Sequence, residues 1–219
     1  MPTEDLAPTS TPLEEEPGPE NIAALLSSPN PIWKSVGVAY ANAVSQYAMW
    51  RAGELRGFRI AGRRILDAVP QLSQGRCGVA VVVGHMPPLV ERLRGVCREV
   101  LVLERNPRLR FGKGVYPDTA APRIVPLGEV VVITGAALVN DTFDSVVELA
   151  RGAELRIAVG PTAALHPSLF AEAGLDYVAS LRVVDVGAVE RTLMWGGGRW
   201  SIDRYCEDYV AELRSRGRA

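Results

Sequence analysis

Residues 77–104 read CGVAVVVGHMPPLVERLRGVCREVLVLE, a stretch in which two kinds of pattern alternate. The first segment, 77–83, is β-branched with almost no polar side chain, which is typical of a strand covered on both faces in a parallel sheet. Two prolines open the next segment, and because proline suits the first turn of a helix, we predict a crossover helix over 87–94. A second strand is predicted over 99–103, and Glu104 closes it. The stretch therefore predicts a βαβ unit.

The same alternation continues toward the C-terminus. Three further short apolar runs predict strands, at 129–133, 155–159 and 177–184. The segments 141–150 and 169–173 are helical in pattern, and 202–214 is predicted to be a terminal helix that packs on the body or forms an oligomer surface. Alternating buried strands and helices of this length predict an α/β fold with an open, doubly wound, mostly parallel Rossmann-like sheet.

The N-terminal quarter of the chain has a different composition. Residues 1–19 hold five prolines among Thr, Ser and Glu, a composition typical of a flexible tail. Apolar side chains at a spacing of three to four predict a buried helix over 35–51, with Ser35 as a possible N-cap. We expect three parts: a disordered acidic tail at 1–19, a small, reduced α or α+β subdomain at 20–74, and a Rossmann-like domain at 75–219.

The charge balance excludes some classes of partner. The 219-residue chain has a formal net charge of -1, but residues 1–33 carry six acidic side chains and no Lys or Arg. The rest of the chain carries 24 basic and 19 acidic residues, about +5. Because this excess is small and dispersed, we expect no nucleic-acid partner.

Hydropathy and cysteine spacing bear on the compartment. The longest apolar run, 130–139, is about half the ~20 residues of a membrane span, so no membrane partner is expected. The chain starts with acidic, Pro-rich sequence, unlike a secretory signal, and we expect a cytoplasmic protein. Cys77, Cys97 and Cys206 lie far apart with no Cys-x-x-Cys pair, which favours structural thiols over a disulfide framework or a zinc site. Cys97 is placed near the end of a predicted surface helix, where an exposed thiol is the alternative.

In an open α/β sheet, ligands bind beyond the carboxyl ends of the strands. His85 falls there and could be a metal ligand, a general base, an anion donor or a structural hydrogen-bond partner. Glu104 could accept hydrogen bonds from ribose hydroxyls or be an ordinary solvated carboxylate. Gly84 lacks the full Gly-x-Gly-x-x-Gly fingerprint, so it supports dinucleotide binding only weakly. His166 lies at the same edge or simply starts a helix, and Asp141 is explained by an N-cap.

Five blocks in order carry a resemblance: VGVAYANAVSQ (36–46), VVVGHMPPLVERL (81–93), VLVLERNP (100–107), VVITGAALVNDTFDSVVELA (131–150) and AVGPTAALHPSLFAEAGLDYVASLRVVD (158–185). Over about residues 35–200 the chain resembles the "putative heavy-metal chelation" family, domain of unknown function 364. The resemblance implies a Rossmann-like C-terminal domain, a smaller N-terminal domain similar to the enolase N-terminal fold, and a cleft between them for a metal or a metal-chelating ligand. The family's motif residues correspond here to Gly84, His85, Pro87, Glu104, Thr134, Gly135, Asn140, Thr142, Gly160, Pro161 and Thr162.

Three functions are therefore considered. The first is binding of a heavy metal, a metal chelate or a small anionic ligand, with His85 and His166 as candidate ligands of a transition metal. The two histidines would follow non-adjacent strands in a sheet of order 2-1-3-4-5. The second is a nucleotide-binding or S-adenosylmethionine-binding enzyme, and the third is a noncatalytic oligomeric scaffold. The residues leave open whether a reaction is catalysed, and a homo-oligomer is expected.

Overall fold

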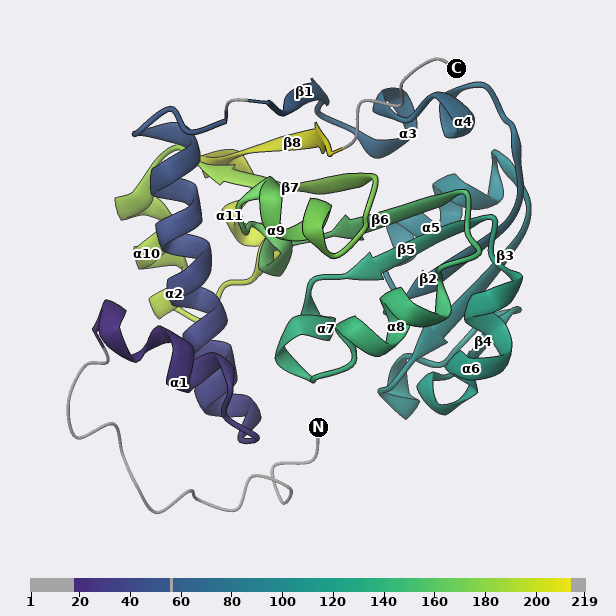
Figure 1. Cartoon of the computed structure of the whole chain (residues 1–219), viewed down its shortest axis with the longest axis horizontal. Helices are drawn as coiled ribbons and strands as arrows, with labels where there is room; N and C mark the ends of the chain where they lie inside the picture. Colours follow the sequence, from purple (N-terminus) through teal and green to yellow (C-terminus); the bar gives the residue numbers. More distant parts are fainter. Residues whose placement is uncertain (1–17, 56, 214–219) are drawn as a thin grey trace.

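The computed structural model describes residues 18–55 and 57–213. An eight-stranded sheet runs through them in the order β1-β8-β7-β6-β5-β2-β3-β4 (Figure 1). Its strands are β1 (Arg59–Gly62), β2 (Cys77–Val83), β3 (Cys97–Glu104), β4 (Val115–Pro117), β5 (Val130–Thr134), β6 (Leu155–Val159), β7 (Tyr177–Val183) and β8 (Cys206–Glu212).

Helices connect these strands and cover both faces of the sheet (Figure 1). They are α1 (Ile22–Leu26), α2 (Pro31–Trp50), α3 (Ile65–Ala68), α4 (Pro70–Ser73), α5 (Pro87–Arg94), α6 (Ala121–Ile124), α7 (Ala136–Val139), α8 (Phe143–Leu149), α9 (Pro167–Glu172), α10 (Val186–Met194) and α11 (Arg199–Ile202). Short 3₁₀ turns are η2 (Pro19–Asn21), η3 (Pro107–Leu109), η4 (Asp118–Ala120), η5 (Val125–Leu127), η6 (Pro161–Ala163) and η7 (Asp203–Tyr205). In the described part of the chain, no helix is long and apolar enough to cross a membrane.

The centre of the sheet confirms the predicted α/β class. The five predicted strands are β2, β3, β5, β6 and β7, and their order β3-β2-β5-β6-β7 is the doubly wound order 2-1-3-4-5. All the pairs among them are parallel, with Val81 opposite both Leu101 and Val131. The direction of winding reverses between β2 and β5, so the switch point of the fold lies at the carboxyl ends of these two strands.

Each face of the sheet packs its own hydrophobic core. Alternate residues of β2 and β5 point to opposite faces, so Val81 and Val131 enter one core while Val82 and Val132 enter the other. The first core includes side chains of α2, α6, α8 and α9; the second includes side chains of α3, α4 and α5. Burial on both faces explains why these strands read as continuous apolar runs.

The edges of the sheet differ from the prediction. The predicted terminal helix over 202–214 is wrong: α11 ends at Ile202 and residues 206–212 form β8, which is antiparallel to both β7 and β1. Tyr209, Val210 and Ala211 are consecutive and all buried, which a strand between two neighbours permits and an amphipathic surface helix does not. Strand β4, which was not among the predicted strands, adds a parallel edge beside β3.

The cysteine prediction is also wrong. Cys77 and Cys97 form a disulfide, and Cys97 is a buried residue at the start of β3, not a thiol at the end of a helix. The two residues are register partners on neighbouring parallel strands, with their Cα atoms 4.5 Å apart. The rest of β2 and helix α5 separate them in sequence, and the parallel pairing of β2 with β3 brings them together.

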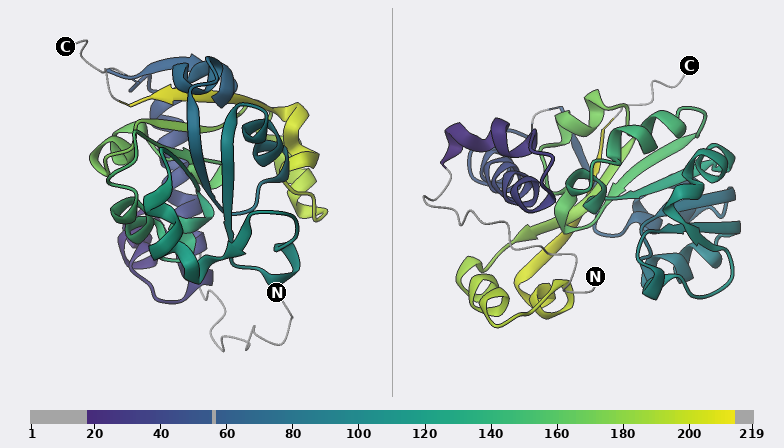
Figure 2. Two further views of the ribbon diagram at one scale, coloured as in Figure 1. Left: turned by 90° about the vertical axis from the view of Figure 1, so that its right-hand side faces the viewer. Right: turned by 90° about the horizontal axis from the view of Figure 1, so that it is seen from below.

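The predicted N-terminal helix is confirmed and is longer than expected. It begins at Pro31, after Asn30, whose side chain accepts a hydrogen bond from Ile32 N at 2.9 Å, so Asn30 and not Ser35 is the N-cap. Figure 2 shows α1 and α2 packed together on one side of the sheet. Strand β1 follows and joins the same sheet through β8. The predicted tail, 1–19, lies almost entirely outside the described residues.

Candidate functional site

The loops that follow β2 and β5 touch at the switch point. Gly84 has φ +92°, and a Cβ added to it would lie 2.7 Å from Thr134 Cγ2. A Cβ on Gly135 would lie 2.4 Å from the backbone nitrogen of Ala163 in η6. Three predicted site residues, Gly84, Thr134 and Gly135, therefore have a packing role that lets the loops after β2, β5 and β6 close against one another.

Glu104 joins the next pair of loops. Its buried carboxylate accepts hydrogen bonds from His85 N at 2.8 Å and from Asn106 N at 2.7 Å, one on each oxygen. The guanidinium of Arg110 donates to the Glu104 carbonyl oxygen at 2.7 Å. Glu104 thus holds the β2–α5 loop against the loop after β3, and both of its carboxylate oxygens already accept a hydrogen bond from a backbone N–H.

His85 is held by one ring nitrogen. Its Nδ1 lies 2.7 Å from the carbonyl oxygen of Leu109, and because a carbonyl only accepts, Nδ1 carries the proton. The ring also packs against Phe111, with centroids 4.9 Å apart. Within the described residues Nε2 makes no hydrogen bond, so His85 offers one free lone pair.

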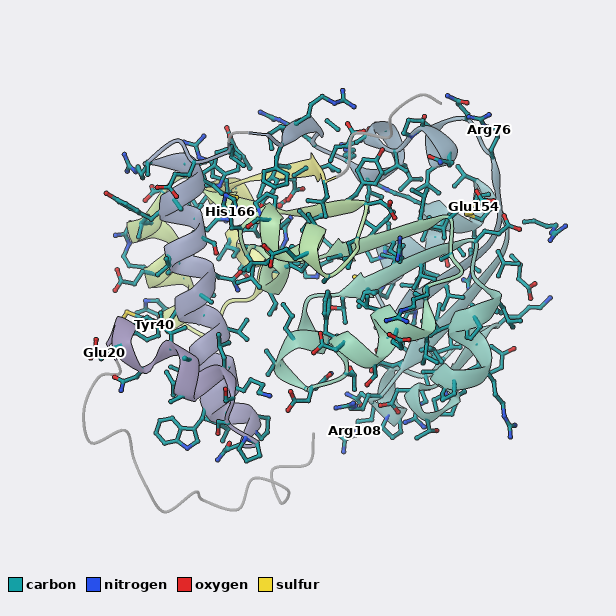
Figure 3. All side chains as sticks on the ribbon, viewed as in Figure 1. Glu20, Tyr40, Arg76, Arg108, Glu154 and His166 are labelled. Atoms are coloured by element: carbon teal, nitrogen blue, oxygen red, sulfur yellow. A yellow bond between two sulfur atoms is a disulfide. The ribbon has the colours of Figure 1, made fainter. Side chains whose placement is uncertain are left out.

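His166 uses both ring nitrogens. Nδ1 accepts from Ser168 N at 3.3 Å as the N-cap of α9, and Nε2 lies 2.9 Å from the carbonyl oxygen of Glu54, to which it donates. No lone pair is left for a metal. Figure 3 labels His166 beside α2, well away from Arg108 of the loop that holds His85. Strand β5 lies between β2 and β6, so the two histidines follow non-adjacent strands, as expected.

The start of α5 provides no cradle for a phosphate. Pro87 and Pro88, the first two residues of the helix, have no backbone N–H. The N–H groups of Leu89 and Val90 both donate to the Met86 carbonyl oxygen. A nucleotide phosphate at this position needs free N–H groups at the helix start, and these four residues have none to offer.

The donor set does not fit a metal centre either. Across residues 18–55 and 57–213, no group of three or more His, Cys, Asp or Glu side chains is placed to hold a metal ion. The two thiols of the first βαβ unit are bonded to each other, and Cys206 lies by itself. Structural zinc sites use four such ligands and catalytic ones three, so the described side chains cannot form a site of either kind.

Of the other predicted residues, Thr162 contacts the N-terminal helix, and Asn140 and Thr142 flank a second contact with it. Asn42 Nδ2 of α2 donates to the Thr162 carbonyl oxygen at 3.1 Å. The Thr142 hydroxyl donates to Asn140 Oδ1 at 2.5 Å, and Asp141 between them pairs with the buried ammonium of Lys34. Lys34 is a residue that the sequence patterns did not single out, since a lone lysine at the start of a helix resembles any solvated one.

A hollow of about 370 Å³ opens on the α5 face of the sheet, between α3, α5 and α11. Of the predicted site residues, Gly160 and Pro161 line it. The remaining lining residues are Arg63, Arg64, Ile65, Leu66, Met86, Pro88, Leu89, Arg92, Val159, Ala179, Ser180, Leu181, Arg199, Trp200, Asp203, Asp208 and Tyr209. We call this hollow the arginine pocket.

The four arginines of this pocket are not equally neutralised. Arg199 pairs with Asp203 and Asp208, both at 2.6 Å, and Arg63 lies 3.9 Å from a Glu207 oxygen. Arg64 and Arg92 have no carboxylate within 4.0 Å among the described residues. The pocket therefore has positive charge available to a ligand, and apolar residues line it as well. Sequence reasoning missed it because Arg63 and Arg64 fall in the predicted N-terminal subdomain, away from the strand ends where the site was expected.

The sheet order and the loops at its carboxyl edge define a doubly wound, Rossmann-like α/β protein. Residues 67–212 match the model of the family described as "Putative heavy-metal chelation", DUF364, which covers most of the chain. The protein belongs to this family, as its sequence blocks predicted.

Solved and curated relatives agree with that assignment. A DUF364 protein of unknown function from Pyrococcus horikoshii is 27% identical, with a TM-score of 0.81 over 95% of this chain and 80% of that one. A second, from Desulfitobacterium hafniense, is 28% identical, with a TM-score of 0.70 over 87% of this chain and 72% of that one. An uncharacterised protein of Methanocaldococcus jannaschii is 36% identical over 154 residues, which span 70% of this chain but only 56% of that relative.

Proposed function

We propose that this protein binds a small anionic ligand in the arginine pocket at the carboxyl edge of its sheet. The observation that carries the proposal is the pair Arg64 and Arg92, two arginines that line the pocket and have no carboxylate within 4.0 Å among the described residues. Arginines that served only solubility would not need to lie together around a hollow that apolar residues also line.

The chemistry of the pocket supports this choice of ligand. A guanidinium presents its N–H donors in a planar fork that matches a carboxylate or phosphate. Met86, Leu89 and Leu181 line the same hollow and give the carbon skeleton of a ligand an apolar surface. The pocket volume of about 370 Å³ lies at the small end of the range for small-molecule sites.

The other predicted residues have supporting roles in this proposal. Gly84, Thr134, Gly135 and Glu104 fix the loops that form the carboxyl edge, and Pro87 starts the helix whose next residues line the pocket. Asn140, Thr142 and Thr162 contact or adjoin the contacts with α2. We do not include His166 as a ligand, because both of its ring nitrogens are used.

Titration calorimetry with citrate and with inorganic phosphate tests the proposal. Arg64→Gln and Arg92→Gln should each weaken binding by about 10-fold or more, since a hydrogen bond to a charged group contributes roughly 1.5–3 kcal/mol. Arg98→Gln is the matched control, because Arg98 is an exposed arginine at the amino end of β3, away from the pocket. Equal affinities for all three variants and the wild type would disprove the pocket as the anion site.

A nucleotide-binding enzyme is the second candidate from the sequence, and the geometry favours it less. The prolines of α5 and the occupied carboxylate of Glu104 remove the two features on which it rested. The proposals of a homo-oligomer and of a cytoplasmic location also stand as predictions. In support of self-association, Met194, Trp195 and Trp200 are largely exposed around the turn that links α10 to α11.

A further inference from the structure

We infer that the heavy metal of the family description reaches this protein as an anionic chelate, whose own ligand supplies the donor atoms while the protein contributes arginines. This inference rests on the proposed anion site and names the class of its ligand. The chelator belongs to the polycarboxylate type, which wraps a metal ion in carboxylate oxygens and leaves the complex with a negative charge. The protein then recognises the charged exterior of the complex and makes no bond to the metal.

The first argument is the disagreement between the family description and the side chains. A chelating protein needs several donors converging on one point, and such a group of three is absent from the described residues. The cysteine sulfurs, the softest ligands, are not available to a metal. Cys77 and Cys97 form a disulfide, and burial raises the pKa of the Cys206 thiol, which keeps it protonated. His85 keeps one lone pair, and one donor does not hold an ion against water.

The second argument is the charge of the arginine pocket. Guanidinium groups stay protonated at all ordinary pH values and have no lone pair for a metal, so they repel a bare divalent cation. Asp203 and Asp208, the two carboxylates in the lining, are both bonded to Arg199 and are not free to coordinate. A metal ion is therefore expected in this pocket only as part of a complex whose net charge is negative.

The third argument is the placement of the two arginines that have no carboxylate partner in the described part of the chain. Arg64 and Arg92 come from two different elements, the start of α3 and the last turn of α5. Two planar forks from different elements suit a ligand that displays carboxylates on more than one side, as a wrapped chelate does. Trp200 and Leu89 lie in the same lining and give the methylene groups of the chelator an apolar contact.

The test compares three probes on the full chain by titration calorimetry: nickel chloride alone, citrate alone, and cobalt(III)–EDTA. The last is an anion whose ligands exchange too slowly for the protein to take the metal with its own side chains. We expect no binding of nickel chloride, and binding of both anions that falls at least 10-fold in Arg64→Gln/Arg92→Gln and is unchanged in His85→Ala and in Arg98→Gln.

The outcomes separate this inference from the proposed function. If citrate binds through the arginines and cobalt(III)–EDTA does not, the chelate inference is wrong and the anion site stands. If neither anion binds, the proposed function itself fails and takes the inference with it. If nickel chloride binds, and that binding is lost in His85→Ala but kept in the double arginine variant, the protein supplies its own metal ligands and the inference is overturned.

Discussion

Lys34 of α2 is buried, and its ammonium pairs with Asp141, whose own side chain is 63% exposed. This ion pair joins the N-terminal helix to the turn between α7 and α8, next to the predicted site residues Asn140 and Thr142. Because one partner is buried and the other is solvated, the two ends of the pair should respond differently to substitution.

We expect Asp141→Asn to destabilise the protein more than Lys34→Met. The first change leaves a buried cation without its partner, at about 2 kcal/mol, whereas the second leaves a carboxylate that water can solvate, at well under that value. Asparagine tolerates the left-handed backbone of Asp141, where φ is 60°, so strain does not confound the comparison. Urea denaturation of both variants and of the double variant measures the difference. Equal losses would mean that the ion pair is not the contact that holds α2.

The disulfide gives a second expectation. Cys77–Cys97 closes a loop with a sequence separation of 20, for which the chain-entropy model predicts a stabilisation of about 3 kcal/mol. A reducing agent should lower the urea midpoint of the wild type by a corresponding amount. The double variant Cys77→Ser/Cys97→Ser should unfold at that lower midpoint with or without the reductant. An unchanged wild-type midpoint in reductant, with free thiols confirmed by titration, would contradict the expectation.

The parts of the fold that were predictable are those that depend on local pattern. The strands 77–83 and 155–159 and the helix 87–94 have the predicted bounds, because β-branched runs and a proline-started helix are decided within a few residues. Strand β8 was not predictable in this way. Tyr205, Tyr209 and Leu213 match a helical spacing, and only the two neighbours β7 and β1 make a strand the better structure. The disulfide was missed for the same reason, since it depends on the register of two strands.

Tyr209 should make the protein sensitive to alkali. Burial raises the pKa of Tyr209 to about 12, and the nearby side chains of Gln46 and Ser180 offset only part of that rise. Between pH 10 and 12 this tyrosine loses its proton in the unfolded chain but keeps it in the folded one, so stability falls as the pH rises through 10. The loss approaches about 3 kcal/mol near pH 12.

Tyr209→Phe isolates this effect. The Tyr209 hydroxyl has no partner with hydrogen-bond geometry, so its removal should change stability little at pH 7. Denaturation midpoints measured at pH 8, 10 and 11 should fall in the wild type and fall less in the variant. Parallel slopes for the two proteins would show that another group is responsible.

For the candidate site, the sequence predicted an edge of the sheet but not the charged residues that line the pocket. The rule that ligands bind beyond the carboxyl ends of parallel strands selects Gly160 and Pro161, and these two residues line the arginine pocket. The charged residues of that pocket come from the segment before α3 and from α5, α11, η7 and β8, which share no motif. Arg63 and Arg199 are 136 positions apart in the chain, and no single-sequence pattern connects residues so distant.

Glu104 offers a last test, which separates a ligand-binding carboxylate from a structural one. Its oxygens accept the N–H groups of His85 and Asn106, so Glu104→Ala should leave two buried donors unpaired and cost about 2 to 4 kcal/mol in urea denaturation. Glu104→Gln keeps one acceptor oxygen but faces the other N–H with an amide donor, so we expect an intermediate loss. The environment of His85 should change in both variants, which the imidazole proton signals report in an NMR spectrum. If instead both variants are as stable as the wild type, and the His85 signals stay in place, the Glu104 carboxylate is available to bind a ligand. Its role in holding the two loops together is then wrong.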